Sequence, residues 1–421
     1  MSNPHPATQF GPLLREQRRR KGLSQAELGG DRYSGSYISH LESGRRAATP
    51  EVVEFLSQRL GVSRVELGVE PISGKALAAA DRDTGTLEQL LVAERAWHDR
   101  EWSVAATHAA LAAERAFGSG QLERHWEALY IRAQALFSDA DFAGCAEIAV
   151  RLSQHEVAER SSVLRAQALS LASIAYRASD RLGLAIAYAS QAVEVARTTP
   201  PVILAEALMA LVSSMSEAGF PAAETEAHRT RLGDVSLSVE SSHARGMISW
   251  ALGTAAFRAG DVSGGMALHA RAQGLLDPKH DVRLWLRLHR SMANCRLDAG
   301  MTDGVADLLR ISRTGLEIIG NSSDVVELRQ AESKLALMEG RPADAAADLT
   351  LLLADPVLGA AHLGRARSTF LLGQAQLQLG DPRSAANAFV SAARQFEAQG
   401  ALKSAVEAWR FGADAIGAGR T

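Results

Sequence analysis

Cysteine and aromatic residues are scarce in this sequence of 421 residues. There are two cysteines, Cys145 and Cys295, and only 5% of the residues are aromatic. The cysteines lie far apart and neither has the spacing of a zinc site, which excludes a disulfide-rich framework and favours a reduced, cytoplasmic protein. No N-terminal segment has the charge and apolar run of a signal peptide, and no stretch approaches the length that spans a bilayer. We therefore expect no membrane association.

The motifs of common catalytic sites are also missing. The twelve histidines are scattered, without a zinc-protease pattern, a nucleophile elbow or a phosphate-binding loop. Glu94 and His98 share a helix face at a spacing of four residues, but a surface pair or a core histidine is a simpler interpretation than a metal site. Five tryptophans are expected to pack in the core rather than around a cofactor: Trp97, Trp126, Trp250, Trp285 and Trp409. We expect no enzyme activity, no cofactor and no metal.

Neither sign of charge dominates the sequence. The net charge is −3; residues 1–71 hold ten Lys and Arg against eight Asp and Glu, and the remainder holds 35 against 40. An N-terminal part this weakly basic can attract a polyanion only through locally placed arginines. The length indicates two or more domains. Frequent alanines and few β-branched runs favour packed helices over sheets, so we predict an all-α fold.

Residues 23–46 contain the most informative local pattern, which is typical of two short helices joined by a tight turn. Ser24 and Glu27 form an S-x-x-E capping box, so the first helix is expected to begin there. The run Gly29-Gly30-Asp31 then interrupts that helix, because glycine and aspartate are poor helix formers.

The second helix of this pattern can begin at Ser34 or Ser36. Ile38 and Leu41 lie three residues apart on its inward face, and Gly44 ends it in the position of a left-handed cap. Its outward face carries Ser36, Ser39, His40 and Ser43. A surface helix with so many short hydrogen-bonding side chains is suited to base edges and phosphates.

Residues 10–68 resemble the XRE family of lambda-repressor-type helix-turn-helix domains. The matching residues are Leu23-Ser24-Gln25, Glu27-Leu28, Ser36-Tyr37-Ile38-Ser39, Leu41-Glu42, Gly44, Thr49-Pro50 and Leu60-Gly61-Val62-Ser63. The resemblance implies a five-helix DNA-binding domain whose reading helix enters the major groove. The sequence departs from the family between Leu28 and Ser34, where it is one residue shorter and contains Gly29-Gly30, which bears on the tilt of the reading helix.

The resemblance also implies which residues contact DNA. Gln25 and Tyr37 are expected to touch phosphates, and four residues are expected to face the groove: Ser34, Ser36, Ser39 and His40. Gln25 lies at a helix N-terminus, where backbone amides favour a phosphate. Arg45 and Arg46 follow the helix and are expected to add salt-sensitive attraction that is independent of sequence. For His40, contact with a guanine edge and a solvated surface histidine both stay open.

Two neighbouring features also have open interpretations. Gly35 stands where the family often has a long polar side chain that reads bases, and this predicts weak discrimination between sequences. The run Arg18-Arg19-Arg20-Lys21 is either a phosphate clamp or the solvated end of a first helix, whose dipole favours cations there.

The rest of the sequence repeats with a period of 40 residues. Small residues recur at Ala93, Ala133, Ser173, Ser213, Gly253, Ala293, Ser333 and Gly373, and twelve residues later at Ala105, Cys145, Ala185, Thr225, Gly265, Val305, Ala345 and Ala385. Turn positions between the two series hold Arg100, Ala140, Asp180, Gly260, Gly300, Gly340 and Gly380. Because small residues let crossing helices approach closely, we expect about eight helix-turn-helix units over 82–401.

The repeats resemble tetratricopeptide repeats in the offset of their small residues and in turns such as Arg258-Ala259-Gly260-Asp261. The usual period of that family is about 34 residues, and HEAT repeats, which have a longer period, are the alternative. A series of large apolar residues four positions after the first small series is interrupted by Arg177 and Glu217. The resemblance implies a right-handed superhelix of helical hairpins.

These patterns predict three segments. They are a helix-turn-helix domain at residues 1–68, a linker at 69–85 and a repeat domain at 86–421. A capping helix is expected at 402–417, with apolar residues Val406, Trp409, Ala413 and Ile416. Such a helix covers the apolar face that a terminal repeat cannot bury by itself.

In tetratricopeptide domains the first helix of each repeat lines the concave face. By that resemblance, the candidate ligand-binding residues are Trp250, Arg287, Arg290, Asn294, Lys334, Arg367, Phe370 and Gln374, with Thr254 and Gln330 beside them. Cations and amides between aromatic walls suit a peptide and its carboxylate, and Arg290 with Asn294 resembles the carboxylate clamp of these domains. Alternatively, Arg287 and Arg290 are solvated or pair with acids such as Asp298.

The whole arrangement resembles the peptide-pheromone receptor regulators of Gram-positive bacteria. It implies a transcriptional regulator that binds double-stranded DNA as a homodimer on a roughly palindromic operator. A peptide or small acidic effector in the superhelix is expected to change its pitch and so the spacing of the two heads. The alternative is a DNA-tethered scaffold whose repeats bind another protein. An enzyme on a repeat scaffold is the third class, which the missing catalytic constellation disfavours.

Overall fold

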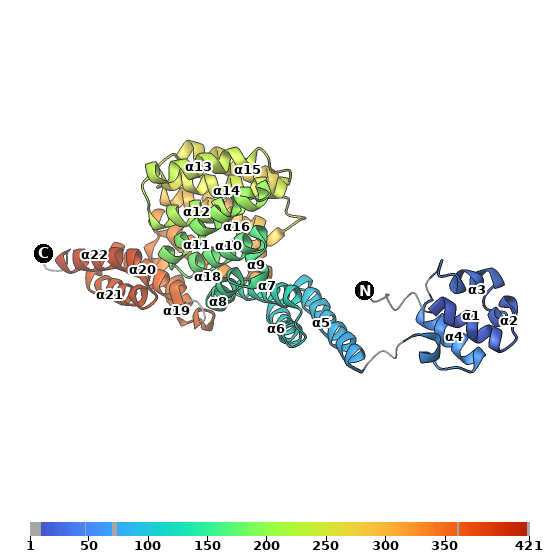
Figure 1. The fold of residues 1–421 in the computed structure, drawn as a ribbon. Helices are drawn as coiled ribbons and strands as arrows, with labels where there is room; N and C mark the ends of the chain where they lie inside the picture. The colour runs from blue at the N-terminus through green and yellow to red at the C-terminus, as the bar shows by residue number, and fades with distance from the viewer. Residues whose placement is uncertain (1–9, 47, 70–73, 360–361, 419–421) are drawn as a thin grey trace. The chain divides into compact units, whose positions relative to one another are not determined.

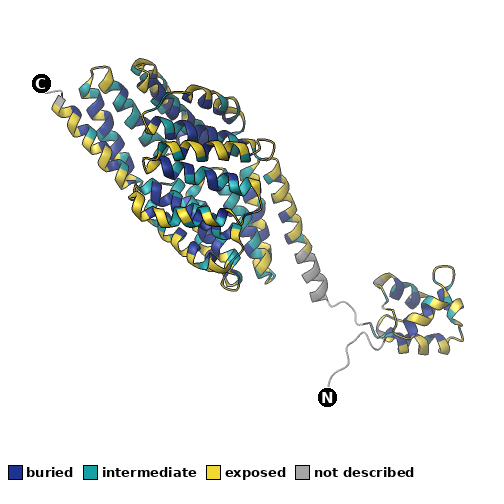
Figure 2. Cartoon of the chain, turned by 90° about the horizontal axis from the view of Figure 1, so that it is seen from above, coloured by how far each residue is buried: buried dark blue, intermediate teal, exposed yellow. Residues whose placement is uncertain are grey.

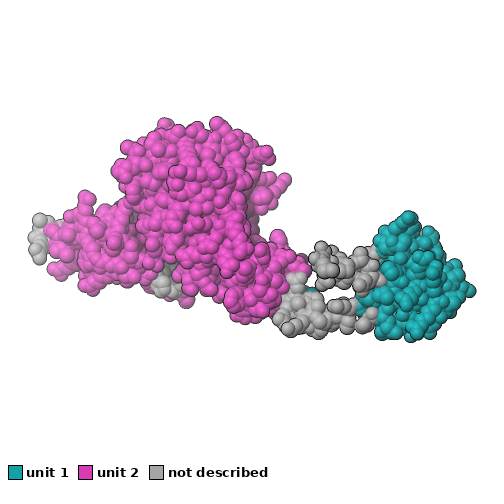
Figure 3. All heavy atoms as spheres, viewed as in Figure 1, with its two compact units in different colours: residues 1–84 teal, residues 85–421 magenta. Residues whose placement is uncertain are grey.

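The computed structural model divides the chain into two compact units, residues 1–84 and residues 85–421 (Figure 3). The residues that it describes are 10–46, 48–69, 74–359 and 362–418. Every regular element in these ranges is a helix, which confirms the predicted all-α class. Buried residues lie along the faces that neighbouring helices share (Figure 2).

The N-terminal unit packs its elements around one small apolar core (Figure 1). The elements are α1 (Phe10–Arg20), α2 (Gln25–Gly29), α3 (Gly35–Glu42), α4 (Pro50–Leu60) and the 3₁₀ turn η2 (Val65–Leu67). Where the family resemblance implied a fifth helix, the chain forms only this single 3₁₀ turn. Each element contributes a side chain that is at most 1% exposed: Leu14, Leu28, Ile38, Leu41, Leu56, Leu60 and Leu67.

The repeat part consists of eight successive helix pairs and a final single helix (Figure 1). The pairs in the described ranges are α5 (Gly74–His98) with α6 (Trp102–Gly118), α7 (Leu122–Ser138) with α8 (Phe142–Ser153), α10 (Ser162–Ala178) with α11 (Leu182–Val195), α12 (Pro201–Ala218) with α13 (Ala222–Ser236), α14 (Ser242–Arg258) with α15 (Val262–Leu275), α16 (Val282–Asp298) with α17 (Val305–Ile319), α18 (Ser322–Met338) with α19 (Pro342–Ala354), and α20 (His362–Gln378) with α21 (Pro382–Ala398). The final helix is α22 (Leu402–Ala418). Three short elements lie between pairs: α9 (Glu156–Glu159), η3 (Ala196–Thr198) and η4 (Pro356–Gly359).

The periodic small residues lie where the two helices of a pair cross. Ala133 and Cys145, one from each helix of the second pair, are both fully buried. A Cβ atom added to Gly253 would lie 2.4 Å from Cδ2 of His269, and one added to Gly373 would lie 2.8 Å from Cε1 of Phe389. The period of 40 residues therefore reflects close helix approach, as the sequence predicts.

In seven of the eight described pairs, the turn requires a backbone conformation that favours glycine at the same position; in the fourth pair Gly219, one residue earlier, adopts it. Gly260, Gly300, Gly340 and Gly380 have φ angles between 72° and 85°. Arg100, Ala140 and Asp180 occupy the same turn position with φ angles of 62°, 67° and 59°. Because L-residues are strained in this region, the three earlier turns cost stability that the later turns do not.

The segment expected as a linker is largely helical. Helix α5 begins at Gly74 and runs unbroken for 25 residues, so its first turns lie within the range 69–85. Residues 70–73 lie outside the described residues.

Helix α12 contradicts the expectation that no segment is long enough to span a membrane. Its 18 residues reach a mean hydropathy of 1.4, which is sufficient by length and composition. However, 56% of the helix is buried inside the protein, and it packs against α10, α11, α13 and α14. The apolar character of α12 is thus explained by its position at the centre of the array.

The last helix packs in an unexpected orientation. Val406, Trp409 and Ile416, expected to form the apolar face of a capping helix, are 69%, 38% and 47% exposed. Small residues form the contact with the preceding repeat instead: Ala401, Ala405, Ala408, Gly412 and Ala415. The largest apolar side chains of α22 therefore point mostly away from the array.

Candidate DNA-binding surface and inner face of the repeats

Helix α2 begins and ends through contacts that its sequence specifies. The Ser24 hydroxyl accepts a hydrogen bond from the Glu27 amide at 3.1 Å, and the Ser24 amide donates to the Glu27 carboxylate at 2.7 Å. These bonds hold the pKa of Glu27 below its usual value. At the other end, Arg59 of α4 donates from Nε and Nη2 to the Glu27 carbonyl oxygen at 3.1 and 3.0 Å. The capping box predicted from the sequence is present.

The Gly29-Gly30 departure from the family pattern has a steric explanation. Gly30 has a φ angle of 57°, and a Cβ atom there would lie 3.0 Å from the Arg59 guanidinium. Glycine at this position therefore leaves room for the arginine that satisfies the last carbonyl groups of α2.

Helix α3 presents a polar face above a fully buried apolar one. Ser34 is its N-cap and accepts from the Tyr37 amide at 3.2 Å. Ile38 and Leu41 are 0% and 1% exposed, whereas the predicted groove-facing residues of the helix are exposed: Ser36, Ser39 and His40. The apolar side fixes the helix against α1 and α2, so the polar side has a defined orientation.

An aromatic and cationic cluster lies beside α3. The Tyr37 ring stacks on Tyr33 at 5.1 Å between centroids, and the Arg46 guanidinium lies 4.8 Å above the Tyr37 ring. Arg45 is exposed without an ion pair among the described residues. Tyr37 thus positions one of the two arginines predicted to attract phosphates.

Gln25 and Arg18 share a buried partner. The Gln25 side-chain amide donates to Glu42 Oε2 at 2.9 Å, and Arg18 donates to the same oxygen at 3.0 Å and to the Leu23 carbonyl at 2.7 Å. Burial raises the pKa of Glu42, but these hydrogen bonds outweigh it and hold the pKa below its usual value. Arg18 therefore belongs to the domain interior, which fits neither the phosphate clamp nor the solvated helix end considered for it.

Gly35 faces the neighbouring helix rather than open space. A Cβ atom on Gly35 would lie 3.2 Å from the backbone nitrogen of Ala26 in α2. The absence of a side chain at this position lets α2 and α3 approach closely, and a longer residue there would first meet α2.

In the repeat part, contacts between distant repeats show that the array curls round. Asn321 at the start of α18 donates to the carbonyl oxygen of Ser138, at the end of α7, at 2.9 Å. Arg283 of α16 donates to the same oxygen at 3.3 Å. Arg367 of α20 lies 3.7 Å from the carboxylate of Asp180, which follows α10. The first helices of early and late pairs therefore face one another on the inner side of the array.

Arg287 and Arg290 are brought together by an acid that the sequence did not single out. Asp324 of α18 accepts from Arg287 Nε at 2.6 Å and Arg290 Nη1 at 2.9 Å, and also from Arg283 Nε at 3.0 Å. Its side chain is 2% exposed. Burial alone raises the pKa of Asp324, but the three guanidinium groups reverse this and hold it well below its usual value. The partner of the arginines is thus Asp324 and not Asp298.

The arginine cluster carries excess positive charge. Arg290 also pairs with Glu327, so three arginines face two carboxylates. Burial and the charge of Arg287 lower the pKa of Arg283, which is the effect expected where cations outnumber anions. The Arg287 side chain remains 26% exposed, whereas that of Arg290 is 11% exposed.

The other predicted ligand residues lie on the first helices of successive pairs, α14, α16, α18 and α20. Trp250 donates to the Ser291 hydroxyl at 2.9 Å, Lys334 pairs with Asp298, and Phe370 packs against Phe389 and Phe411. Thr254 contacts His269, and Gln330 donates to the Gly364 carbonyl. Among the described residues, Asn294 and Gln374 are half-buried and form no side-chain hydrogen bond. Of the two residues that resemble a carboxylate clamp, Arg290 is therefore already paired, whereas the Asn294 amide has no partner among the described residues.

A second charged cluster explains the interruption of the apolar series. Arg177 donates to Glu217 at 3.0 Å, and Arg258 lies 3.8 Å from the same carboxylate. Burial raises the pKa of Glu217, but Arg177, Arg258 and Arg367 together lower it below its usual value. The sequence signal was the pair of charged residues at matching positions of successive repeats.

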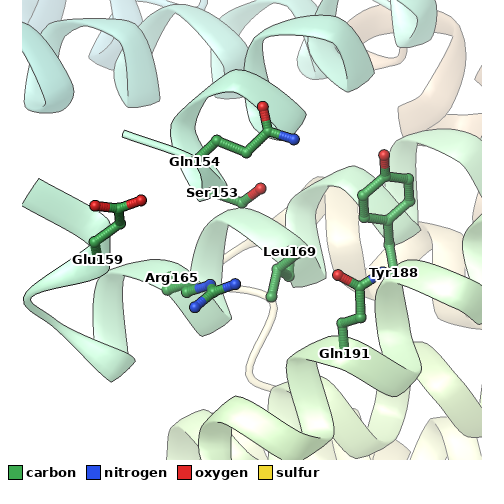
Figure 4. Close-up of a pocket in the computed structure, with 7 residues that line it drawn as sticks. All are labelled: Ser153, Gln154, Glu159, Arg165, Leu169, Tyr188 and Gln191. Carbon is green, nitrogen blue, oxygen red and sulfur yellow. The ribbon is translucent and has the colours of Figure 1, made fainter. Parts of the chain in front are cut away.

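One polar cavity of about 300 Å³ lies away from the predicted ligand residues (Figure 4). It is formed where α9 separates two helix pairs, and its lining residues are Ser153, Gln154, Glu159, Arg165, Leu169, Tyr188 and Gln191. The period of 40 residues gave no indication of it, because repeated positions do not show that the segment between α8 and α10 forms the short helix α9.

Residues 9–68 match the family of helix-turn-helix domains. The match confirms the helix-turn-helix prediction, and the narrower assignment to the XRE family stays a prediction. No curated protein matches the chain. The matched range contains the whole of α3, and its role in reading bases stays a prediction.

Solved structures with similar folds include three bacterial regulators. The Bacillus thuringiensis protein PlcR, in complex with the peptide PapR7 and DNA, is 10% identical over 78% of this chain and 98% of its own, with a TM-score of 0.34. The Rap conjugation gene regulator of plasmid pLS20, in complex with the Phr* peptide, is 13% identical over 89% and 98%, with a TM-score of 0.47. The Streptococcus dysgalactiae pheromone receptor Rgg2 is 11% identical over 66% and 97%, with a TM-score of 0.28.

Proposed function

We propose that this protein is a cytoplasmic, sequence-specific DNA-binding transcriptional regulator that acts as a homodimer. The observation that carries the proposal is the two-sided character of α3. Ile38 and Leu41 anchor the helix from below, and Ser36, Ser39 and His40 are left exposed with hydrogen-bonding groups that suit base edges. Arg45 and Arg46 add the cations that draw a duplex to this face.

The DNA-binding part is tested by selecting bound fragments from random duplexes at physiological ionic strength. We expect a roughly palindromic consensus, because a dimer presents two reading helices about 34 Å apart. The double substitution S36A/H40A is expected to change the preferred bases. A protein that retains no duplex in preference to random competitor would overturn the proposal.

We further propose that the inner side of the repeats binds a peptide or small acidic effector. Arg287 is the cation of the cluster with the most exposed side chain, and three arginines there face only two carboxylates. An added carboxylate can therefore be held by a guanidinium fork without leaving an anion unpaired. Asn294 and Gln374 supply unengaged amides for a peptide backbone. The repeat pattern assigns Trp250, Lys334, Arg367 and Phe370 to the same side, and we include them in the proposed site.

The effector also has a proposed route to the DNA-binding head. Arg283 contacts both the arginine cluster and the Ser138 carbonyl of the early repeats. An anion bound at Arg287 changes the charge balance around Asp324 and hence the contact that joins the two halves of the array. The ligand shifts the conformation only if it binds one pitch of the array more tightly than the other.

Effector binding is tested by calorimetry with short acidic peptides. Arg287→Gln and Asn294→Ala are expected to weaken binding about tenfold each, since each removes one charged or polar contact. Arg310→Gln is the matched control, because Arg310 is an exposed cation of the adjacent helix α17 with only an exposed partner. Equal weakening by all three variants would contradict an effector site at this cluster.

A DNA-tethered scaffold is the second candidate, and a specific observation favours it. All four predicted ligand-binding cations already have carboxylate partners within the chain: Arg287 and Arg290 pair with Asp324, Lys334 with Asp298 and Arg367 with Asp180. A protein that needs no effector can use the half-buried amides and its outer surface to hold another protein. Co-purification of a stoichiometric partner, with peptides failing to bind, would support the scaffold.

A further inference from the structure

The outer face of α22, the last helix among the described residues, is unusually apolar for an exposed helix face. Such faces of soluble proteins are normally polar. Here Leu402, Val406, Trp409 and Ile416 are 68%, 69%, 38% and 47% exposed. The fifth large apolar residue of the helix, Phe411, packs inward on Phe370 and Phe389. Four of five large apolar side chains thus face outward.

The exposed residues follow the spacing of a coiled-coil seam. Leu402, Val406, Trp409, Ala413 and Ile416 are separated by four, three, four and three residues. On an α-helix this spacing gives one narrow, continuous stripe, which we call the α22 stripe. The contact with α21 orients the stripe, because the Trp409 indole donates to Glu397 at 2.9 Å.

Charged residues flank the stripe in alternating order. Lys403, Glu407, Arg410 and Asp414 each follow a member of the stripe by one residue, and all four are exposed. None of the four forms an ion pair within 4 Å of another described residue, although the Lys403 ammonium lies beside Gly219 and acts electrostatically on the Asp180 carboxylate. Along the helix these charges alternate as positive, negative, positive and negative. When a second copy of the helix runs in the opposite direction, each positive charge can therefore face a negative one.

We propose that the α22 stripe is a self-association surface, which pairs antiparallel with the stripe of a second copy of this chain. With a two-fold axis between Ala408 and Trp409, Lys403 lies opposite Asp414 of the second copy, and Glu407 lies opposite Arg410 of the second copy. Such self-complementarity is what a two-fold interface requires. The inference rests on the proposed homodimer and assigns it a surface.

The stripe supplies the apolar centre that a dimer contact needs. Contiguous exposed apolar patches larger than a few hundred Å² mark interaction sites, and a standard interface of about 800 Å² per partner also draws on the residues around such a centre. One helix of 17 residues with four large apolar side chains supplies the dry centre. The flanking charges supply a polar rim that fixes direction and register.

The proposal is tested on the full-length protein by sedimentation equilibrium. The wild type is expected to be a dimer at micromolar concentration, and V406E/W409E is expected to raise its dissociation constant at least about a hundredfold. Leu237→Glu is the matched control, since Leu237 is 82% exposed on a different surface. Circular dichroism confirms that each variant is folded; Leu402→Glu serves if the double variant does not fold.

Charge exchange tests the antiparallel direction. Arg410→Glu is expected to weaken the dimer several-fold because it faces Glu407 of the second copy, and E407R/R410E is expected to restore it. Failure of the exchange to restore affinity would overturn the antiparallel arrangement. A wild type that remains monomeric would overturn both the surface and the homodimer. A dimer unaffected by V406E/W409E would overturn the α22 surface alone and leave the proposed regulator intact.

Discussion

Asp324 is the residue on which the inner cluster depends. Its carboxylate accepts from three arginines and also takes part in the N-terminal capping box of α18. Removing the charge leaves three guanidinium groups around a neutral side chain in a site that is 2% exposed. The loss of one partner of a buried ion pair is costly, because the remaining charges stay desolvated.

We predict that Asp324→Asn lowers the free energy of unfolding by ~3–5 kcal/mol, as measured by urea denaturation. The matched variant Glu327→Gln is expected to cost less, because that side chain is 38% exposed. Similar losses for both variants would contradict the central role of Asp324.

The same residue predicts a pH dependence of stability. The folded pKa of Asp324 lies below its unfolded value of 3.8, so its stabilising contribution is fully present above pH 3.8. This contribution is lost as the pH falls from there towards the folded pKa, because the unfolded state binds the proton first. Asp324→Asn is expected to flatten the acid limb of the stability curve. An unchanged slope in thermal unfolding between pH 5 and 2.5 would speak against this assignment.

A substitution at the turn residue Ala140 is expected to stabilise the protein, whereas Asp324→Asn is expected to destabilise it. Its φ angle of 67° lies in the left-handed region, where glycine is favoured. Ala140→Gly is expected to raise the free energy of unfolding by about 1 kcal/mol, and Gly260→Ala to lower it by a similar amount. If both variants destabilise the protein, the turn strain is relieved elsewhere.

At the scale of elements, different residues in and after α3 are expected to attract DNA and to discriminate between its sequences. We expect Arg45, just after the helix, to attract phosphates, and Ser36 and His40 on the helix to read bases. Arg45→Ala is expected to reduce the slope of log affinity against log salt by about one, without changing the preferred sequence. S36A/H40A is expected to change the preferred sequence while leaving that slope unaltered. Fluorescence anisotropy at several salt concentrations measures both quantities, and a change of preference in Arg45→Ala would contradict the division.

Helices and their ends could be predicted from the sequence because local signals specify them. The Ser24–Glu27 capping box and the turn glycines are contacts within a few residues, which the spacing reveals. The burial of Arg18 could not be predicted, because its partner Glu42 is 24 residues away and the run of basic residues suggests a surface. The orientation of α22 could also not be predicted from the sequence, because the spacing of its apolar residues is the same whether they face the array or the solvent.

At the scale of the molecule, the closing contacts are what the repeat period cannot reveal. The period describes neighbours, whereas Asn321 bonds to a carbonyl 183 residues earlier. The predicted ligand positions rest on family resemblance alone and stay a prediction. Arg287 and Arg290 pair with Asp324 of the next repeat, a contact between neighbours that the period allows but does not specify. The spacing of repeated residues can be counted along the sequence, but contacts between repeats that are far apart in the sequence, such as Asn321 with Ser138, cannot.

The contact between Arg367 and Asp180 predicts how the two halves move. Arg367→Gln is expected to speed amide hydrogen exchange in α20 to α22, because it removes an attraction between late and early repeats. Lys334→Gln is the control, since Lys334 pairs only with Asp298 of the preceding repeat. Uniform acceleration in both variants would show that the contact has no special role in holding the halves together.

The Ser138 carbonyl group has a consequence for how the chain is made. Arg283 and Asn321 bind it from segments that leave the ribosome long after α7. A nascent chain that ends before α18 therefore contains stacked repeats but lacks the hydrogen bond from Asn321 to the Ser138 carbonyl group. Both contacts to Ser138 are therefore in place only after α18 has been translated, and once formed they are expected to make the repeats between α7 and α18 unfold together rather than fray one by one.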